Sequence, residues 1–156
     1  MCSSDLTGNV DAGTISFLEG AISALNTAYG SASALGNGIS GLGNETVTID
    51  DTASIDASAL NTLNGYTTGN VDATTAESFT GTISDLNTLY AAAASSGDGI
   101  KGLGSEAVTV TDSSVSASDL NTLNTNTDYN ITVNATAISG SLSDVDTLYG
   151  NKADEI

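Results

Sequence analysis

Acidic side chains are the residues of this chain whose spacing could support chemistry. Asp50 and Asp51 are adjacent in TIDD at 48–51, and further carboxylates lie in DAS at 56–58 and NTDYN at 126–130. Paired carboxylates can cleave glycosidic bonds, and loops of Asp and Asn can bind calcium. Neighbouring residues of a strand point to opposite faces, so Asp50 and Asp51 are a poor catalytic pair. Neither the Gly-Gly-x-Gly-x-Asp nonapeptide nor an Asp-x-Asp-x-Asp-Gly loop with a distal Glu occurs, which leaves calcium a weak possibility.

Other catalytic chemistries lack their side chains. The sequence contains no His and no Arg, and its single Cys is Cys2. Ser-His-Asp triads, guanidinium clamps and imidazole metal sites are therefore unavailable. We expect no enzyme and no cofactor.

Two glycine-rich segments could indicate a phosphate site. They are GISGLG at 38–43 and GIKGLG at 99–104. A dinucleotide-binding loop follows a strand and opens a helix. These segments instead follow a helical pattern and precede a strand pattern, so we predict helix C-caps and turns.

The charge balance excludes two classes of partner. Asp and Glu number 19 against 2 Lys and Arg, which gives a formal net charge of −17. Such a chain has almost no cations with which to replace the counterions of nucleic acid or of an anionic membrane surface. No apolar run approaches the ~18 residues of a membrane span. We expect no nucleic-acid binding and no membrane insertion.

The chain is similar to itself along its length. NVDATTAESFTGTISDLNTLY at 70–90 matches 9–29 with a shift of 61, and 99–124 matches 38–64. ITVNATAISGSLSDVDTLY at 131–149 is a further copy. Internal similarity of this kind is the signature of repeat architectures, because one unit alone cannot bury its apolar side chains.

Each unit combines a strand pattern with a helix pattern. Val108 and Val110 alternate with Thr in VTVT, which is typical of a strand with one buried face. GTISDLNTLYAAAA has helical spacing, with Thr82 or Ser84 as its N-cap. The sequence therefore predicts an α/β repeat solenoid of stacked strand-plus-short-helix coils with a parallel sheet, and a right-handed all-β helix is the alternative. The predicted coils are 9–46, 47–69, 70–107, 108–130 and 131–156.

Equivalent positions of successive coils should stack in rows. We predict a core row of large aliphatic residues, a structural ladder of Asn with one Asp that hydrogen-bonds successive backbones, and an outward polar column on the sheet. The core row is Leu25, Leu60, Leu86, Leu120 and Val145. The ladder is Asn26, Asn61, Asn87, Asn121 and Asp146. The outward sheet face is Asp11, Thr48, Asp72, Thr109 and Thr132.

Two motifs carry a resemblance across about residues 9–149. GLGSEAVTVTDSSVSASDLNTLN and NVDATTAESFTGTISDLNTLY resemble the tandem repeats of very large, acidic, secreted proteins of marine cyanobacteria and other marine bacteria. The resemblance is carried by Gly102 to Val110 and Leu120 to Leu123, and by Gly41 to Ile49 and Leu60 to Leu63 in the earlier copy. It implies a location outside the cell or on its surface.

The functional expectation is structural. Terminal repeats normally need a polar cap, and neither SSDLTGNV nor GNKADEI has an obvious one. Solenoid ends that lack a cap can stack head to tail, and such contacts generate open filaments. We expect a non-enzymatic extracellular protein that assembles with itself end to end into a filament or surface array. The alternative is an adhesin or stalk segment that binds calcium or glycan through its acidic sheet face.

Overall fold

The computed structural model describes residues 10–32, 38–93 and 98–155, so positions 9, 33–37, 94–97 and 156 of the predicted coils lie outside it. Short strands alternate with helices throughout. The strands are β1 (Val10–Asp11), β2 (Phe17–Gly20), β3 (Ile39–Ser40), β4 (Thr46–Ile49), β5 (Ser54–Asp56), β6 (Asn70–Asp72), β7 (Ser78–Gly81), β8 (Gly99–Lys101), β9 (Ala107–Val110), β10 (Ser114–Ser116), β11 (Ile131–Val133) and β12 (Ala137–Ser139). The helices are α1 (Ile22–Ala32), α2 (Ala57–Tyr66), α3 (Ile83–Ala91), α4 (Ala117–Asn124) and α5 (Leu142–Glu155).

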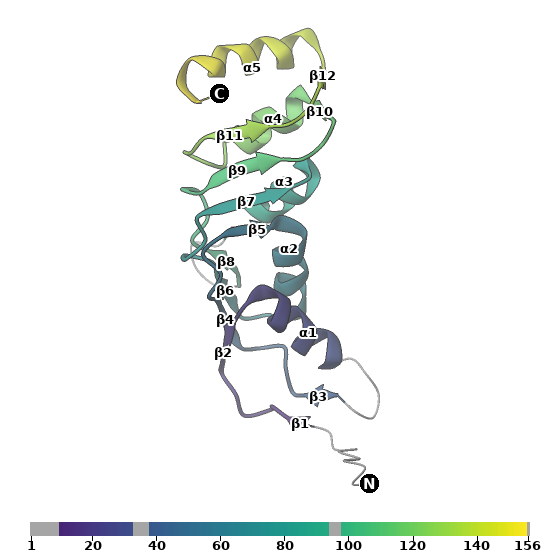
Figure 1. Ribbon diagram of the computed structural model, residues 1–156, viewed down its shortest axis with the longest axis vertical. Helices are drawn as coiled ribbons and strands as arrows, with labels where there is room; N and C mark the ends of the chain where they lie inside the picture. Colours follow the sequence, from purple (N-terminus) through teal and green to yellow (C-terminus); the bar gives the residue numbers. More distant parts are fainter. Residues whose placement is uncertain (1–9, 33–37, 94–97, 156) are drawn as a thin grey trace.

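The fold is α/β with parallel sheets, as the strand and helix patterns predicted. Every strand pair among the described residues is parallel, and the sheets are open, in the orders β1-β3, β2-β4-β6-β8, β5-β7-β9-β11 and β10-β12. Figure 1 shows the strands following one another along the long axis, with the helices beside them. The all-β alternative is wrong, because Ala, Leu and Asn at helical spacing form helices between the strands.

Side-chain caps fix where three of the helices begin. Asp56 accepts a hydrogen bond from the Ala59 amide at the start of α2, Thr82 caps α3 through the Asp85 amide, and Ser116 caps α4 in the same way. Each cap ends a strand or follows it directly, so the chain turns from strand to helix without a loop. The predicted N-cap at Thr82 is confirmed.

The strand pairs and helix contacts arrange the elements in five successive levels of the described chain. Each helix packs on the next, α1 on α2 through to α4 on α5. From the N-terminal side, the levels are β1, β2 and α1; β3, β4, β5 and α2; β6, β7 and α3; β8, β9, β10 and α4; and β11, β12 and α5. We refer to them as the first to the fifth level.

A thin core lies between the strands and the helices. Leu25, Leu60, Leu86 and Leu120 of the predicted core row are buried in it, and Val145 packs against it partly buried. The strands contribute Val47, Val71 and Ile100, which are neighbours in one sheet and fully buried. Strand pairing thus places these buried side chains beside their counterparts on the adjacent levels, within one core cluster that one level alone could not provide.

The structure corrects the boundaries of the predicted coils 9–46 and 70–107. The glycine-rich segments close these coils in the prediction, but their first halves form β3 and β8. Since β3 pairs with β1 and β8 pairs with β6, each belongs with the level that follows. The C-cap of α3 is Ala92, so the 99–104 segment does not cap that helix.

Close contact between levels explains glycine at two of these positions. Gly41 has φ 86° and Gly102 has φ 83°, a region that favours glycine. A Cβ on Gly102 would lie 2.6 Å from the Cα of Thr74 on the level before. The glycine-rich segment can pass Thr74 only without a side chain at this position.

Candidate functional site

The predicted Asn ladder links each helix to the next. The Nδ2 atom of each Asn donates to a backbone carbonyl in the first turn of the following helix, at distances of 2.9–3.2 Å. The pairs are Asn26 to Ala59, Asn61 to Asp85, Asn87 to Asp119 and Asn121 to Asp144. The ladder therefore runs through backbone carbonyls and joins the levels along the helical side.

The ladder changes character at its last member. Asp146 lies exposed on α5, where a carboxylate replaces the amide and has no N–H to donate. The Oδ1 atoms of the four Asn are buried without a hydrogen-bond partner among the described residues. The donor at each Asn is therefore the group that connects the levels, and Asp146 does not supply it.

The predicted outward column is wrong as a single row. Thr48 pairs with Asp72 in one sheet, Thr109 pairs with Thr132 in a second, and Asp11 pairs with Ser40 in a third. The acidic sheet face of the binding alternative is thus divided. The column is divided because strands that are equivalent in sequence belong to different sheets.

Two aspartates of the loops after strands cap helices on the level before. Asp51 Oδ2 accepts a hydrogen bond of 2.7 Å from the Ile22 amide at the first residue of α1. Asp112 Oδ2 accepts one of 2.7 Å from the Ile83 amide at the first residue of α3. A carboxylate at a helix N-terminus is favoured by the helix dipole, so both bonds stabilise the contact between levels.

A buried carboxylate joins the first and second levels. Glu45 is 1% exposed, and its Oε2 atom accepts hydrogen bonds of 2.8 Å from the Tyr29 hydroxyl and of 2.8 Å from the Gly43 amide. Burial alone would raise the pKa of Glu45, but these hydrogen bonds outweigh it and hold the pKa below its ordinary value. Burial and the adjacent carboxylate raise the pKa of Tyr29. Glu45 is therefore ionised and Tyr29 neutral near pH 7.

A related arrangement of Glu106 and Tyr90, without the hydrogen bond between them, lies between the third and fourth levels. Glu106 is buried, and its Oε2 atom accepts hydrogen bonds from the amides of Gly104 and Ser105. Burial and the negative charge of Glu106 raise the pKa of Tyr90 to about 12. The Tyr90 hydroxyl is buried without a hydrogen-bond partner among the described residues. This copy differs from the first in that backbone amides alone hold the carboxylate.

These Glu–Tyr contacts were not predicted from the sequence, although a signal exists. Gly-x-Glu recurs at 43–45 and 104–106, and Tyr29 and Tyr90 recur with the same shift of 61. A Glu placed before a strand ordinarily lies on the solvated surface, which is why the pattern reads as a polar loop. The recurrence of Glu together with Tyr was the available clue.

The last level exposes large apolar side chains, as the comparison of equivalent positions shows. Ile138, Leu142 and Tyr149 are 50%, 86% and 68% exposed. Their counterparts in the third level, Phe79, Ile83 and Tyr90, are 0%, 8% and 5% exposed. The difference arises because the fourth level covers the third, and no described residue covers the fifth. We call the surface formed by Ile138, Leu142, Tyr149 and the outer edges of β11 and β12 the end face.

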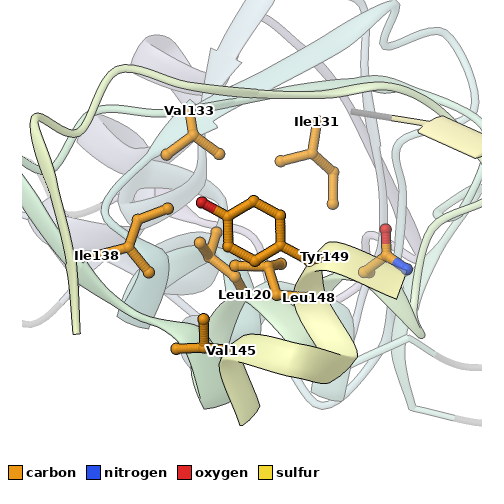
Figure 2. A pocket seen from close by; sticks show the side chains of 8 residues that line it. Leu120, Ile131, Val133, Ile138, Val145, Leu148 and Tyr149 are labelled. Atoms are coloured by element: carbon orange, nitrogen blue, oxygen red, sulfur yellow. The ribbon is translucent and has the colours of Figure 1, made fainter. Parts of the chain in front are cut away.

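A groove opens on this end face. It encloses about 310 Å³ and is lined mainly by aliphatic side chains of α4, β11, β12 and α5, together with Asn124 and Tyr149. Figure 2 shows the Tyr149 ring in the midst of Leu120, Val145, Ile138 and Leu148. The lining is apolar, so the groove favours an apolar side chain over a charged substrate.

Within the described residues, no group of three or more His, Cys, Asp or Glu side chains could hold a metal ion. No helix in that part of the chain has the length and hydropathy to cross a membrane.

Comparison with known proteins gave no match to a family model, to a curated protein or to a solved structure.

Proposed function

We propose that the chain is a non-enzymatic structural protein, a repeat solenoid that extends end to end into a filament or surface array outside the cell. The solenoid interpretation is supported by the parallel pairing of successive levels and by the recurrence of Asn, Glu and Asp contacts between them. The acidic composition and the resemblance to secreted bacterial repeat proteins support the extracellular location.

The observation that carries the proposal is the exposed apolar end face. Ile138, Leu142 and Tyr149 lie at one end of the molecule, and their buried counterparts mark this surface as one that another level covers elsewhere in the chain. Contact between different surfaces of successive molecules produces an open chain when the rotation between neighbours does not close into a ring. The buried apolar area would supply the main driving force.

Negative-stain electron microscopy of the concentrated protein tests this function. The wild type should form particles of uniform width whose length grows with concentration and salt. Leu142→Lys places a charge on the end face at a side chain that is already exposed, so the fold should persist while the long particles disappear. Thr62→Lys, at an exposed position on α2 of the second level whose hydroxyl bonds only the Ser58 carbonyl of its own helix, is the control and should retain them. Short rods of one length for the wild type at every concentration would rule the proposal out.

A further inference from the structure

We propose that the end face binds the first level of a second copy of this chain, with β11 beside β1, β12 beside β2 and α5 beside α1. Asp146 weakens this contact and so limits its affinity. The inference rests on the proposed end-to-end docking. It adds the partner surface, the register of the strands and the residue that controls the strength of the contact.

The first level has an uncovered outer surface of its own. β1 and β2 are the outermost strands of their sheets among the described residues, as β11 and β12 are at the other end. Val10 is 59% exposed, whereas Val71, its counterpart on the third level, is fully buried in a strand that pairs with β4. The first level therefore offers a surface that the chain covers where the same residues recur.

The first strand of the end face matches the strand on which β6 packs inside the chain. β11 reads Ile-Thr-Val at 131–133, and β4 reads Val-Thr-Ile at 47–49. β6 places Val71 and Asp72 opposite the Val-Thr of β4. β1 reads Val-Asp at 10–11 and is the sequence equivalent of those two residues. β1 of a second copy therefore meets on β11 the residue types that β6 meets on β4.

β12 matches in the same way the strand on which β7 packs. Both β12 and β5 have an isoleucine between two small or polar residues, Ile138 in β12 and Ile55 in β5. Ile55 lies opposite Phe79 of β7 and is 2% exposed. The equivalent of Phe79 on β2 is Leu18. Leu18 of a second copy therefore covers Ile138, which is 50% exposed in the single chain.

The alternative partner for β11 is a strand like β8, which pairs with β6 on the other side. β8 places Lys101 opposite Asp72. β11 has Thr132 at the position of Asp72, so it lacks the carboxylate that lies opposite the lysine. The residues of β11 thus favour β1 of a second copy.

The helical side of the contact contains one unfavourable pair. In the covered levels, each ladder Asn donates to the carbonyl of the third residue of the next helix, as Asn61 does to Asp85. The third residue of α1 is Ala24, which is exposed. The ladder position of α5 is Asp146, whose carboxylate has no N–H to donate and repels a carbonyl oxygen. Asp146 therefore opposes the docking that the apolar side chains favour.

Asp146→Asn tests the helical contact by a gain of affinity. The variant restores the donor of the covered levels, and the association constant from sedimentation equilibrium should rise about tenfold, the size of one added hydrogen bond. Asp98→Asn removes the same charge at an exposed aspartate before β8 and is the matched control. An association constant no higher in Asp146→Asn than in Asp98→Asn would overturn the assignment of α1 as the partner of α5.

Cysteine pairs test the register of the strands. The proposed alignment puts Phe17 of one copy opposite Ala137 of the next, and both side chains are exposed. A chain with Cys2→Ser, Phe17→Cys and Ala137→Cys is oxidised by copper phenanthroline in air and separated on a non-reducing gel. We expect a ladder of covalent multimers. Glu19→Cys in place of Phe17→Cys is the control, and it should crosslink at least about tenfold more slowly, because two residues along a strand add ~6.6 Å.

Equal crosslinking of the two cysteine pairs, or no crosslinking of either where the chain associates, would overturn the inference. Circular dichroism confirms that each variant is folded. Sedimentation of the unmodified chain separates this failure from failure of the proposed function. Association without register-specific crosslinks rejects the partner surface and leaves the proposed function standing, whereas a chain that stays monomeric at every concentration rejects both.

Discussion

The Tyr29 hydroxyl donates a hydrogen bond of 2.8 Å to Oε2 of Glu45, a buried carboxylate on the next level of the chain. This bond joins residues from α1 and from the loop before β4, and the Gly43 amide donates to the same oxygen atom. The contact between these levels thus depends on an ionised carboxylate that is shielded from water. Its strength must vary with pH.

We predict a loss of stability in acid that Glu45→Gln reduces. The folded-state pKa of Glu45 lies below its ordinary value of 4.5, so its ionisation stabilises the fold above that value. The stabilisation is lost as the pH falls through the folded-state pKa. Urea unfolding at a series of pH values from neutral to strongly acid measures the slope, which should be shallower in Glu45→Gln. Glu77→Gln, at an exposed glutamate, is the control, and an equal slope in both variants would contradict the account.

In alkali, the tyrosines should destabilise the fold. The pKa of Tyr90 is raised from 10.0 to about 12, so the unfolded chain loses this proton first and stability falls as the pH rises from 10 toward 12. Tyr90→Phe removes the titrating group and should lessen this fall. The free energy of unfolding of the wild type and of Tyr90→Phe, measured above and below pH 10, shows whether the substitution lessens the fall. A wild-type stability that stays constant across this range would show that Tyr90 ionises freely.

The donor in the Asn ladder should matter more than the size of the side chain. In the wild type, Nδ2 of Asn61 donates to the carbonyl of Asp85 at 2.9 Å. Asn61→Asp places a carboxylate against that carbonyl. We expect a loss of about 1–3 kcal/mol at neutral pH, and a smaller one for Asn61→Ala, which removes the donor without adding a charge. Thermal or urea unfolding of the two variants shows which substitution lowers the stability more. The reverse order would mean that packing, not the hydrogen bond, links the helices.

Glycine should be required at position 102 and dispensable at position 65. Gly102→Ala combines a φ of 83° with a Cβ 2.6 Å from Thr74 backbone, so the loop or the previous level must move, at an expected cost above 1 kcal/mol. Gly65 lies in α2 with nothing within 4 Å of an added Cβ. Gly65→Ala should stabilise the protein by about 0.5–1 kcal/mol. Equal effects of the two substitutions in urea unfolding would refute the close approach.

Local features of the fold follow from the sequence. The cap at Thr82 and the buried Leu86 were predictable, because helix caps and apolar spacing are set within one turn. Truncation of Leu86 to Ala should cost roughly 2–5 kcal/mol, as for other buried leucines.

The lateral arrangement of the strands could not be predicted in the same way. Val10 and Val71 are equivalent in sequence and pair with the equivalent residues Ile39 and Ile100, but Val71 also pairs with Val47 on the level before, which places its strand in a larger sheet. The second level uses three strands where the first uses two, so the sheet position of each equivalent strand shifts. The number of strands in a level depends on which strands of the adjacent levels pair with it. Comparing the sequence with itself does not give this pairing. The predicted outward column failed for this reason.

Salt should promote association between molecules. The net charge of −17 opposes the approach of two copies, and salt screens this repulsion over about 10 Å at 0.1 M. The apolar end face is not weakened by screening. The association constant should therefore rise with sodium chloride concentration, as light scattering or sedimentation would show. A decrease with salt would indicate that ionic contacts hold the copies together.

Sedimentation equilibrium of the wild type and Leu142→Lys over a wide concentration range tests the central claim most directly. The account predicts that the weight-average mass of the wild type rises steadily above that of one chain, without a plateau, because each added molecule presents a new end face. Leu142→Lys should remain at the mass of a single chain. A wild type that stays monomeric, or a variant that associates as strongly as the wild type, would contradict end-to-end assembly through this surface.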